Sequence, residues 1–376
     1  MKKVSLLVLA VLFNTSFVMA QELALVRTND MFGYIDKTGA IVIEPQFDKA
    51  GDFSEGKAAA FKNDKWGFID ASGNWVIQPT YDKVKSFNSG YALVLKDDQW
   101  QYINSSGTTL NTPIKEKYYD FDESGVAFYR VEKKLGLIGT DGKVFLEPTY
   151  DVIKPFVNGY AKVGNNDMWG MISKSGSVYI PLEYDELGDY NSKAVWARKG
   201  ESFGVISSGT FNIVANADKI WDFTDDSNLS YARSDKKIGF INTKAEWVIQ
   251  PSFDKARAFN EGLAPVVKDK KWGYINEKGE EVVPLMFRDA ETFSDDGLAP
   301  VKEKKLWGFI DKTGKMIIPA EYEITAGGFS LFSKNNLKGF KDGVARVKKG
   351  KQWGFIDTSG NPIGGKWYQN VENFSK

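Results

Sequence analysis

The 376-residue chain contains no cysteine and no histidine. Without cysteine it can form no disulfide, no thiolate nucleophile and no thiolate metal site. Without histidine the Ser-His-Asp and Cys-His catalytic arrangements and the usual zinc sites are excluded as well. We therefore expect no metal site, no cofactor and no catalytic residue, and we expect a protein that is not an enzyme.

Neither sign of charge dominates the chain, which has 49 Lys and Arg residues against 49 Asp and Glu residues. No net field would therefore draw the whole molecule to nucleic acid or to a membrane surface. We expect no nucleic-acid partner on this ground.

Long apolar runs are also missing, apart from one near the start of the chain. Residues 4–13 are apolar, follow two lysines and precede the small residue Ala20, which is the order found in a secretory signal peptide. We expect residues 1–20 to be a signal peptide that is cleaved after Ala20. Residues 21–376 would then be secreted or periplasmic and would contain no membrane span, because no later run is long enough to cross a bilayer.

Ten copies of one short motif recur along the rest of the chain, most clearly as Trp-Gly-Phe-Ile-Asp at residues 66–70, 307–311 and 353–357. The glycine of the motif, or the residue in its place, stands at Gly33, Gly67, Gln101, Gly136, Gly170, Gly204, Gly239, Gly273, Gly308 and Gly354. Successive copies are 34 or 35 residues apart, except for a last gap of 46 residues. A fixed period of this length indicates tandem repeats, in which each unit buries its apolar face by stacking on its neighbours.

Each unit alternates short runs of aromatic and β-branched residues with polar turns, which is typical of strands. We expect three short antiparallel strands per unit, with a tight hairpin at stretches such as Asp-Lys-Thr-Gly 311–314. The glycine after the tryptophan would let another backbone or ring approach closely. The expected core of the repeats comprises Trp66, Gly67, Trp100, Trp169, Gly170, Trp272, Gly273, Trp307, Gly308, Trp353 and Gly354.

These residues resemble the bacterial WG-repeat family, which is named for its Trp-Gly pair. The Trp-Gly-Phe-Ile-Asp core, the glycine turn, a Pro-x-x-Tyr-Asp stretch and a Phe-x-x-Gly-x-Ala-x-Val link recur in this order over about residues 23–374. The resemblance implies an envelope or secreted protein, and it supplies no catalytic residue.

The repeats could form an open array or a closed ring. The ten units share one phase, and the sequence shows no blade that is split between the two termini. A unit of 34 residues is also short for a four-stranded propeller blade, and ten blades would exceed the usual about four to eight. We therefore predict one open, twisted array over residues 21–376, with a propeller-like ring as the alternative. An insertion at about residues 327–341 precedes the last unit.

Lysines concentrate in the link between the first and second strands of most units, and acidic residues concentrate before the first strand. Stacked units would align these lysines into a basic ridge that engages an anionic envelope polymer. The alternative is that they are solvated turn residues that protect strand edges from aggregation. The candidate binding lysines are Lys268, Lys270, Lys271, Lys302, Lys304 and Lys305.

Trp196 and Trp221 lie away from the repeated tryptophan position and are candidates for exposed, sugar-binding side chains. The alternative is that both pack at the rim of the core. The leading hypothesis is an exported, non-catalytic repeat protein that presents an extended surface to an envelope component or another protein. A carbohydrate-binding module that uses exposed tryptophans, or a glycan-acting enzyme with two carboxylates about 5–10 Å apart, are the other possibilities.

Overall fold

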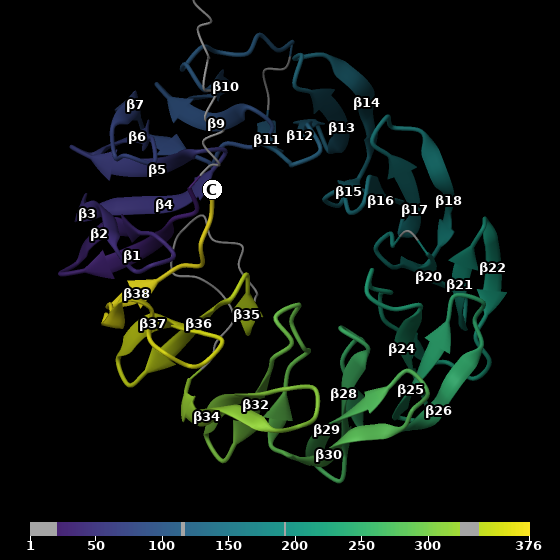
Figure 1. Cartoon of the computed structure of the whole chain (residues 1–376). Coiled ribbons are helices and arrows are strands. Elements are labelled where there is room, and N and C mark those ends of the chain that lie inside the picture. Colours follow the sequence, from purple (N-terminus) through teal and green to yellow (C-terminus); the bar gives the residue numbers. More distant parts are fainter. Residues whose placement is uncertain (1–20, 114–116, 192, 324–337) are drawn as a thin grey trace, which may run out of the picture.

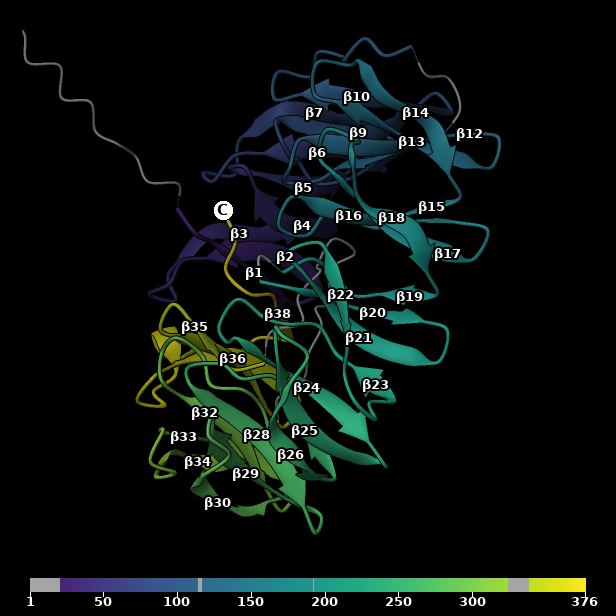
Figure 2. The same cartoon turned by 90° about the vertical axis from the view of Figure 1, so that its right-hand side faces the viewer.

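The computed structural model describes residues 21–113, 117–191, 193–323 and 338–376. Within these ranges the chain forms strands β1 to β38 and one short 3-10 helix, η1 (Ile363–Gly365), and the strands assemble into ten sheets. The prediction of an all-β repeat fold is therefore confirmed. Figures 1 and 2 show that the sheets follow one another as blades around a common centre. No helix in the described part of the chain is long and apolar enough to cross a membrane.

Within a blade the strands run outward from an inner strand, which lies nearest the centre of the ring (Figure 1). From blade one to blade ten, the inner strands are β38 (Asn370–Val371), β4 (Lys49–Ser54), β8 (Lys83–Val84), β11 (Lys117–Phe121), β15 (Val152–Ile153), β19 (Glu186–Leu187), β23 (Lys219–Ile220), β27 (Lys255–Ala256), β31 (Asp289–Ala290) and β35 (Phe340–Lys341). The second strands are β1 (Ala24–Thr28), β5 (Lys57–Lys62), β9 (Tyr91–Lys96), β12 (Val126–Val131), β16 (Tyr160–Asn165), β20 (Val195–Lys199), β24 (Leu229–Ser234), β28 (Leu263–Lys268), β32 (Ala299–Glu303) and β36 (Val344–Lys349).

The third strands carry the Trp-Gly motif. They are β2 (Met31–Ile35), β6 (Lys65–Ile69), β10 (Gln99–Asn104), β13 (Lys134–Gly139), β17 (Met168–Ser173), β21 (Ser202–Ser207), β25 (Lys237–Asn242), β29 (Lys271–Asn276), β33 (Leu306–Ile310) and β37 (Gln352–Asp357). The outer strands are β3 (Ile41–Phe47), β7 (Trp75–Tyr81), β14 (Val144–Tyr150), β18 (Val178–Tyr184), β22 (Thr210–Ile213), β26 (Trp247–Phe253), β30 (Glu281–Phe287) and β34 (Met316–Tyr322). In the described residues, blades three and ten have no outer strand.

The sheets contain one more strand per unit than the three that the sequence predicts. The additional inner strand directly follows the Tyr/Phe-Asp stretch and is only two residues long in most blades, as in Lys83–Val84. A strand this short pairs with the second strand of the following repeat, Lys83 with Leu95 and Val84 with Val94. Four strands therefore fit into about 34 residues because the inner strand requires almost no additional chain.

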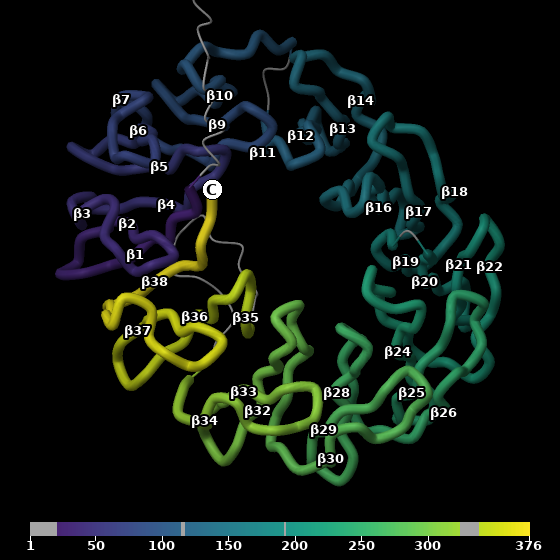
Figure 3. Tube along the Cα trace, viewed as in Figure 1, coloured from purple at the N-terminus to yellow at the C-terminus, as the bar shows by residue number. Residues whose placement is uncertain are grey.

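A two-residue inner strand also closes the ring, so the prediction of an open array is wrong. The inner strand of blade one is β38, which pairs with β1 through Val26–Val371 and Arg27–Asn370. The Glu372 amide donates to the Leu25 carbonyl at 2.8 Å, and further bonds join residues 23 and 375. One blade is thus built from both ends of the repeat region, and Figure 3 shows the two coloured ends of the tube side by side.

The glycine of the Trp-Gly motif lies directly against the outer strand. A Cβ atom on Gly273 would lie 2.5 Å from the Val283 carbonyl oxygen, and one on Gly67 would lie 2.5 Å from the Ile77 carbonyl oxygen. The register between third and outer strands shifts at this point, which moves the outer backbone across the glycine. Gln101 takes the place of this glycine in blade three, where the described residues contain no outer strand.

Aromatic pairs and hydrogen bonds repeat at the junctions between blades. Ring centroids are 4.7 Å apart for Phe68 and Phe87, and 4.8 Å apart for Phe240 and Phe259. The junctions also contain bonds from Tyr hydroxyls to the next inner strand, such as Tyr274 to the Glu291 carbonyl at 2.7 Å. Each blade therefore completes its core only with a neighbour, as expected of tandem repeats.

The predicted signal peptide, residues 1–20, lies outside the described residues. The predicted insertion at 327–341 lies outside them up to residue 337.

Candidate functional site

Antiparallel strands give the ring two different faces. The turns between second and third strands, together with the links from each outer strand to the next blade, lie on one face, which we call the turn face. The hairpins between third and outer strands and the links from inner to second strands lie on the opposite face. The lysine-rich links of the sequence therefore lie on the turn face, and the acidic stretches that precede the second strands lie on the other.

Ion pairs repeat along the turn face. The aspartate that follows the outer strand pairs with the first lysine of the third strand, as in Lys65–Asp82, Lys134–Asp151 at 2.8 Å and Lys237–Asp254. The hydrogen bond from Lys237 lowers the pKa of Asp254. These pairs are exposed, so they contribute little to stability, but they neutralise much of the lysine charge on this face.

Blade eight departs from this pattern because Arg288 stands where six other blades have aspartate. The corresponding residues are Asp48, Asp82, Asp151, Asp185, Asp218 and Asp254. The lysine that would pair with this aspartate is Lys271, whose ammonium instead donates to the Met286 carbonyl at 3.3 Å. An expected ion pair is thus replaced by two positive charges on the same blade.

A pocket of about 640 Å³ opens beside Arg288, at the inner end of blades seven and eight on the turn face. Its aromatic lining comprises Trp221, Tyr231 and Trp272. Its ionic lining comprises the basic residues Arg233, Lys236, Lys255, Arg257 and Arg288 and the acidic residues Asp254 and Asp289. Basic side chains therefore outnumber acidic ones by five to two among the described lining residues.

The aromatic wall is rigid. The rings of Trp221 and Tyr231 stack with centroids 4.7 Å apart and an interplanar angle of 19°. The Arg257 guanidinium lies 5.0 Å from the centroid of the Trp272 ring, at the distance of a cation–π contact. The Lys219 ammonium also lies 4.7 Å from the centroid of the Trp221 ring. Aromatic side chains from blades seven and eight thus line the pocket and are held by these contacts.

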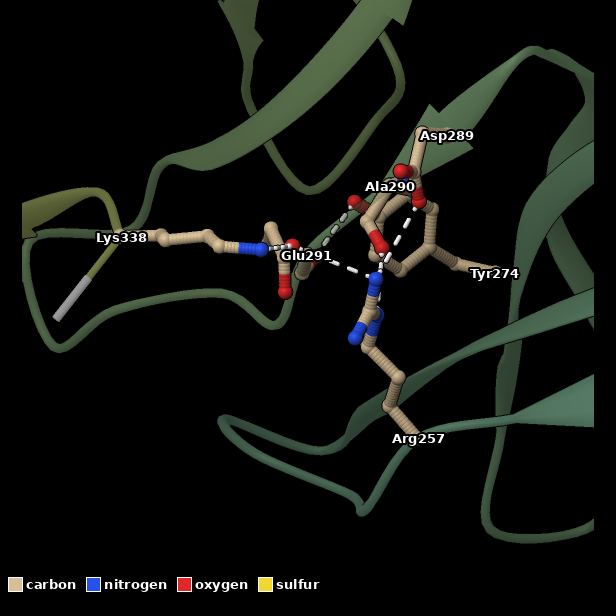
Figure 4. A network of polar contacts seen from close by, with 6 residues as sticks. All are labelled: Arg257, Tyr274, Asp289, Ala290, Glu291 and Lys338. Carbon is tan, nitrogen blue, oxygen red and sulfur yellow. Dashed lines mark hydrogen bonds and ion pairs between the residues drawn. The ribbon is translucent and has the colours of Figure 1, made fainter. Parts of the chain in front are cut away.

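Two of the five basic side chains are anchored. Figure 4 shows Arg257, whose Nε donates to the Ala290 carbonyl at 2.8 Å and whose Nη2 lies 3.2 Å from both Asp289 and Glu291. Glu291 is buried and also pairs with Lys338 at 2.6 Å. Arg233 pairs with Asp218. Since Lys237 holds Asp254, both acidic residues of the pocket are also engaged.

The other three basic side chains are available to a ligand. Lys236, Lys255 and Arg288 are exposed, and their side chains form no hydrogen bond or ion pair with any residue that the structure describes. They come from three separate segments: a turn of blade seven, the inner strand of blade eight and the link to blade nine. The pocket therefore presents three unneutralised positive charges around aromatic surfaces.

The structure places the six predicted lysines on the same face as this pocket but not in its lining. Lys268, Lys270 and Lys271 occupy the turn of blade eight, and Lys302, Lys304 and Lys305 occupy the turn of blade nine. All except Lys302 are exposed; the Lys302 ammonium lies 5.6 Å from the centroid of the Trp307 ring.

The two off-pattern tryptophans lie at successive blade junctions. Trp221 lines the pocket, whereas the Trp196 indole donates to Asp222 at 2.7 Å in the preceding junction. Both are half-buried. Of the tryptophans at the repeated position, Trp66 and Trp307 are buried, while Trp100, Trp169, Trp272 and Trp353 are half-buried.

Sequence reasoning missed Lys255, Arg257 and Arg288. A comparison of equivalent repeat positions could have found Arg288, because Phe287-Arg288 replaces Tyr-Asp or Phe-Asp of other units. Arg257 and Trp221 likewise occupy one repeat position, which is glycine at Gly51 and Gly188. The signal in the sequence was therefore the variation among repeats at one position directly after the inner strand, near the ring centre.

A second pocket, of about 620 Å³, lies on the opposite face near blades three to five. Its ionic lining consists of Asp122, Glu123 and Lys174. Its charge balance is therefore opposite to that of the first pocket, in agreement with a ring whose two faces differ in charge.

Comparison with known proteins identifies the repeat. The family model described as "WG containing repeat" matches residues 32–66, 66–100, 136–169, 169–202, 238–272, 272–307 and 307–337, which is more than half of the chain. No curated protein matches the sequence.

Among solved structures, a eukaryotic initiation factor matches with a TM-score of 0.52 at 11% identity, covering 94% of this chain and 98% of that chain. The extracellular domain of the putative hybrid two component system BT3049 from B. thetaiotaomicron matches with a TM-score of 0.28 at 9% identity, covering 90% and 61%. The first of these likenesses shows a related fold only. The motif, its period and the family match together establish that the chain belongs to the family of proteins with the WG containing repeat.

Proposed function

We propose that this ring is an exported, non-catalytic binding protein whose main contact site is the pocket between blades seven and eight. The observation that carries the proposal is Arg288, which replaces the aspartate of the repeat and leaves the pocket with positive charge that no described residue neutralises. Unpaired, exposed cations around an aromatic pocket suit an anionic ligand.

The carboxylates of the pocket support binding rather than glycan hydrolysis. A glycosidase needs one carboxyl group that can donate a proton and a second that can act as a base or nucleophile. In the pocket, Asp254 is paired with Lys237 and Asp289 with Arg257. The hydrogen bond from Lys237 lowers the pKa of Asp254, so this residue is not suited to act as the acid, and the Asp289 carboxylate is occupied by the Arg257 guanidinium.

The six lysines of blades eight and nine extend the positive surface beside the pocket. They lie on the turn face, where a longer anionic ligand that leaves the pocket would pass. We assign these lysines a supporting role in ligand binding, because salt weakens the attraction between their exposed charges and a distant anionic group.

The test is capture of ligands from envelope extract and spent medium by residues 21–376, repeated at rising salt concentration. The informative variant is Arg288→Asp, because aspartate at this repeat position is compatible with folding in six other blades. Lys83→Gln is the matched control. Lys83 lies in the inner strand of blade three, at the position that Lys255 has in blade eight, and it does not line the pocket.

The proposal predicts that wild type and the Lys83 variant retain the same species, that retention falls as salt rises, and that Arg288→Asp retains much less. Equal retention by Arg288→Asp would contradict it, and so would capture that salt does not weaken.

A further inference from the structure

We propose that the pocket between blades seven and eight binds a carboxylated oligosaccharide, that is, a segment of an acidic glycan. This inference rests on the proposed function and names the chemical class of its ligand. Three properties of the pocket support it: the number of its free cations, its aromatic side chains and its size.

The free cations point to a ligand with more than one anionic group. Lys236, Lys255 and Arg288 belong to three segments around the pocket, so a ligand with several anionic groups can engage them together. A chain of sugar units with a carboxylate on each or every second unit places negative charges at intervals. The planar guanidinium of Arg288 also suits a carboxylate, which it can bind through two parallel hydrogen bonds.

The aromatic surfaces suit the neutral part of such a chain. The C–H faces of a pyranose ring pack against aromatic rings, while its hydroxyl groups remain in water or bind polar atoms. Trp221 and Trp272 are both half-buried and both line the pocket, and their rings are held by Tyr231 and Arg257 respectively. Rigid aromatic surfaces of this kind lose little entropy when a ligand binds.

The size and surroundings of the pocket argue against a nucleic acid or a protein. A volume of about 640 Å³ lies within the range of about 300–1,000 Å³ that is typical of small-ligand sites, whereas protein partners use larger and flatter surfaces. A long polyphosphate would also meet the aspartates that line the rest of the turn face, such as Asp82 and Asp151. The positive charge described here lies in the pocket and in the lysine turns of blades eight and nine beside it, and this limited stretch fits a short anionic segment.

The test is isothermal titration calorimetry of residues 21–376 with four probes. Two are uronate trimers of different stereochemistry, galacturonate and mannuronate. The third is the methyl ester of the galacturonate trimer, which keeps the sugar rings but has no charge. The fourth is inorganic tripolyphosphate, which has charge but no sugar ring. We expect at least one uronate trimer to bind, and its binding to exceed that of both the ester and tripolyphosphate.

Two variants locate the binding. Arg288→Asp removes a charge-assisted hydrogen bond and places a negative charge beside the ligand, so affinity should fall by about tenfold or more. Trp221→Leu keeps an apolar side chain at a position where other repeats have Gly, Lys, Arg or Glu, so it should fold and bind more weakly. The Lys83→Gln control should bind like the wild type.

Several results would overturn the inference. Binding of neither uronate trimer would do so, as would equal binding of tripolyphosphate, which would show that the site reads charge alone. Equal binding of the ester would show that the carboxylates are not recognised. If the Arg288 variant loses ligand capture from extracts while no trimer binds, the proposed function survives and the saccharide assignment fails.

Discussion

At the scale of single residues, two positions explain most of what is particular to this chain. The glycine after each tryptophan lets the outer strand cross the third strand, and Arg288 reverses the charge of a repeated position. The first is a requirement of every complete blade, because any Cβ atom there would meet backbone rather than a side chain that can move. The arginine at position 288 occurs in one blade, so it marks a place where one repeat differs from the others.

The glycine argument predicts that Gly273→Ala destabilises the ring. Its Cβ would lie 2.5 Å from the Val283 carbonyl oxygen, and overpacking of this kind costs about 1–3 kcal/mol. Gly164→Ala is the matched control, since its Cβ would lie 3.5 Å from the nearest atom, in the ring of Trp169. Thermal unfolding of both variants should show a lower midpoint for the Gly273 variant only; equal midpoints would contradict the explanation.

At the scale of elements, the closing strand β38 and the neighbouring inner strand β4 bring charged side chains together. Glu372, just after β38, is buried, while Asp52 of β4 and Arg346 of β36 are half-buried. The charges of Glu372 and Arg346 act on the pKa of Asp52, and those of Glu372 and Asp52 act on the pKa of Arg346. Burial, and then the charge of Glu372, raise the pKa of Asp52 to about 7, while Arg346 opposes the rise. Arg346 also donates to the Val371 carbonyl at 2.8 Å, so the same cluster holds the closing strand.

This cluster predicts that the ring becomes more stable as pH falls from 8 to 5. The pKa of Asp52 is higher in the folded protein, at about 7, than in an unfolded chain, at about 3.9. The folded state therefore binds the proton more tightly. The charged carboxylate costs stability above pH 7, and this cost begins to fall as pH drops through the folded pKa and is gone only below the unfolded pKa. Since each unit of pKa corresponds to about 1.4 kcal/mol, the gain on going from pH 8 to pH 5 is at most about 3 kcal/mol.

Asp52→Asn should be more stable than wild type at pH 8 and should lose this part of the pH dependence. The exposed Asp48→Asn serves as control, because it changes the same kind of side chain directly before β4 begins at Lys49. Chemical unfolding of the three proteins at several pH values provides the measurement. If the Asp52 variant and wild type respond alike to pH, the buried carboxyl group is not the cause.

At the scale of the whole molecule, ten blades close into a ring because β38, which follows the last repeat, forms the inner strand of blade one. This makes the ends of the repeat region neighbours, whereas an open array would place them at opposite ends. The chain contains no cysteine, so an introduced pair can report on this proximity without competing thiols.

Val26→Cys combined with Val371→Cys should form an intramolecular disulfide on mild oxidation. The two residues are paired across β1 and β38, and paired residues of antiparallel strands lie within the Cα separation that a disulfide can span. Mass spectrometry after proteolysis should find the crosslinked peptides in the monomer. Disulfides that form only between molecules, or none at all, would contradict a closed ring.

Sequence reasoning succeeded where the determinants are local. The third strands and their hairpins follow from short motifs such as Trp307 to Gly314, in which residues a few positions apart bond to one another. Trp221 was also selected from sequence, because it departs from the repeat, and it lines the pocket.

Sequence reasoning failed where the partner is distant or the segment is very short. A two-residue strand such as Lys255–Ala256 is too short to show the alternating pattern by which a strand is recognised. The pairing of Val371 with Val26 joins opposite ends of the repeat region, so no local pattern reveals it. The open array was favoured because the ten units share one phase with no visible split blade, because 34 residues are few for a four-stranded blade, and because ten blades exceed the usual about four to eight. The pocket was missed because it forms only when inner strands of neighbouring blades lie side by side.

The central claim is that the pocket between blades seven and eight is where this ring binds its ligand. The most direct measurement is hydrogen–deuterium exchange of residues 21–376 with and without the captured ligand. The account predicts slower exchange in residues 219–238, 255–257 and 288–290, and little change in the equivalent segments of blades two to four. Protection confined to the opposite face, or spread evenly over the lysine turns of all blades, would contradict it.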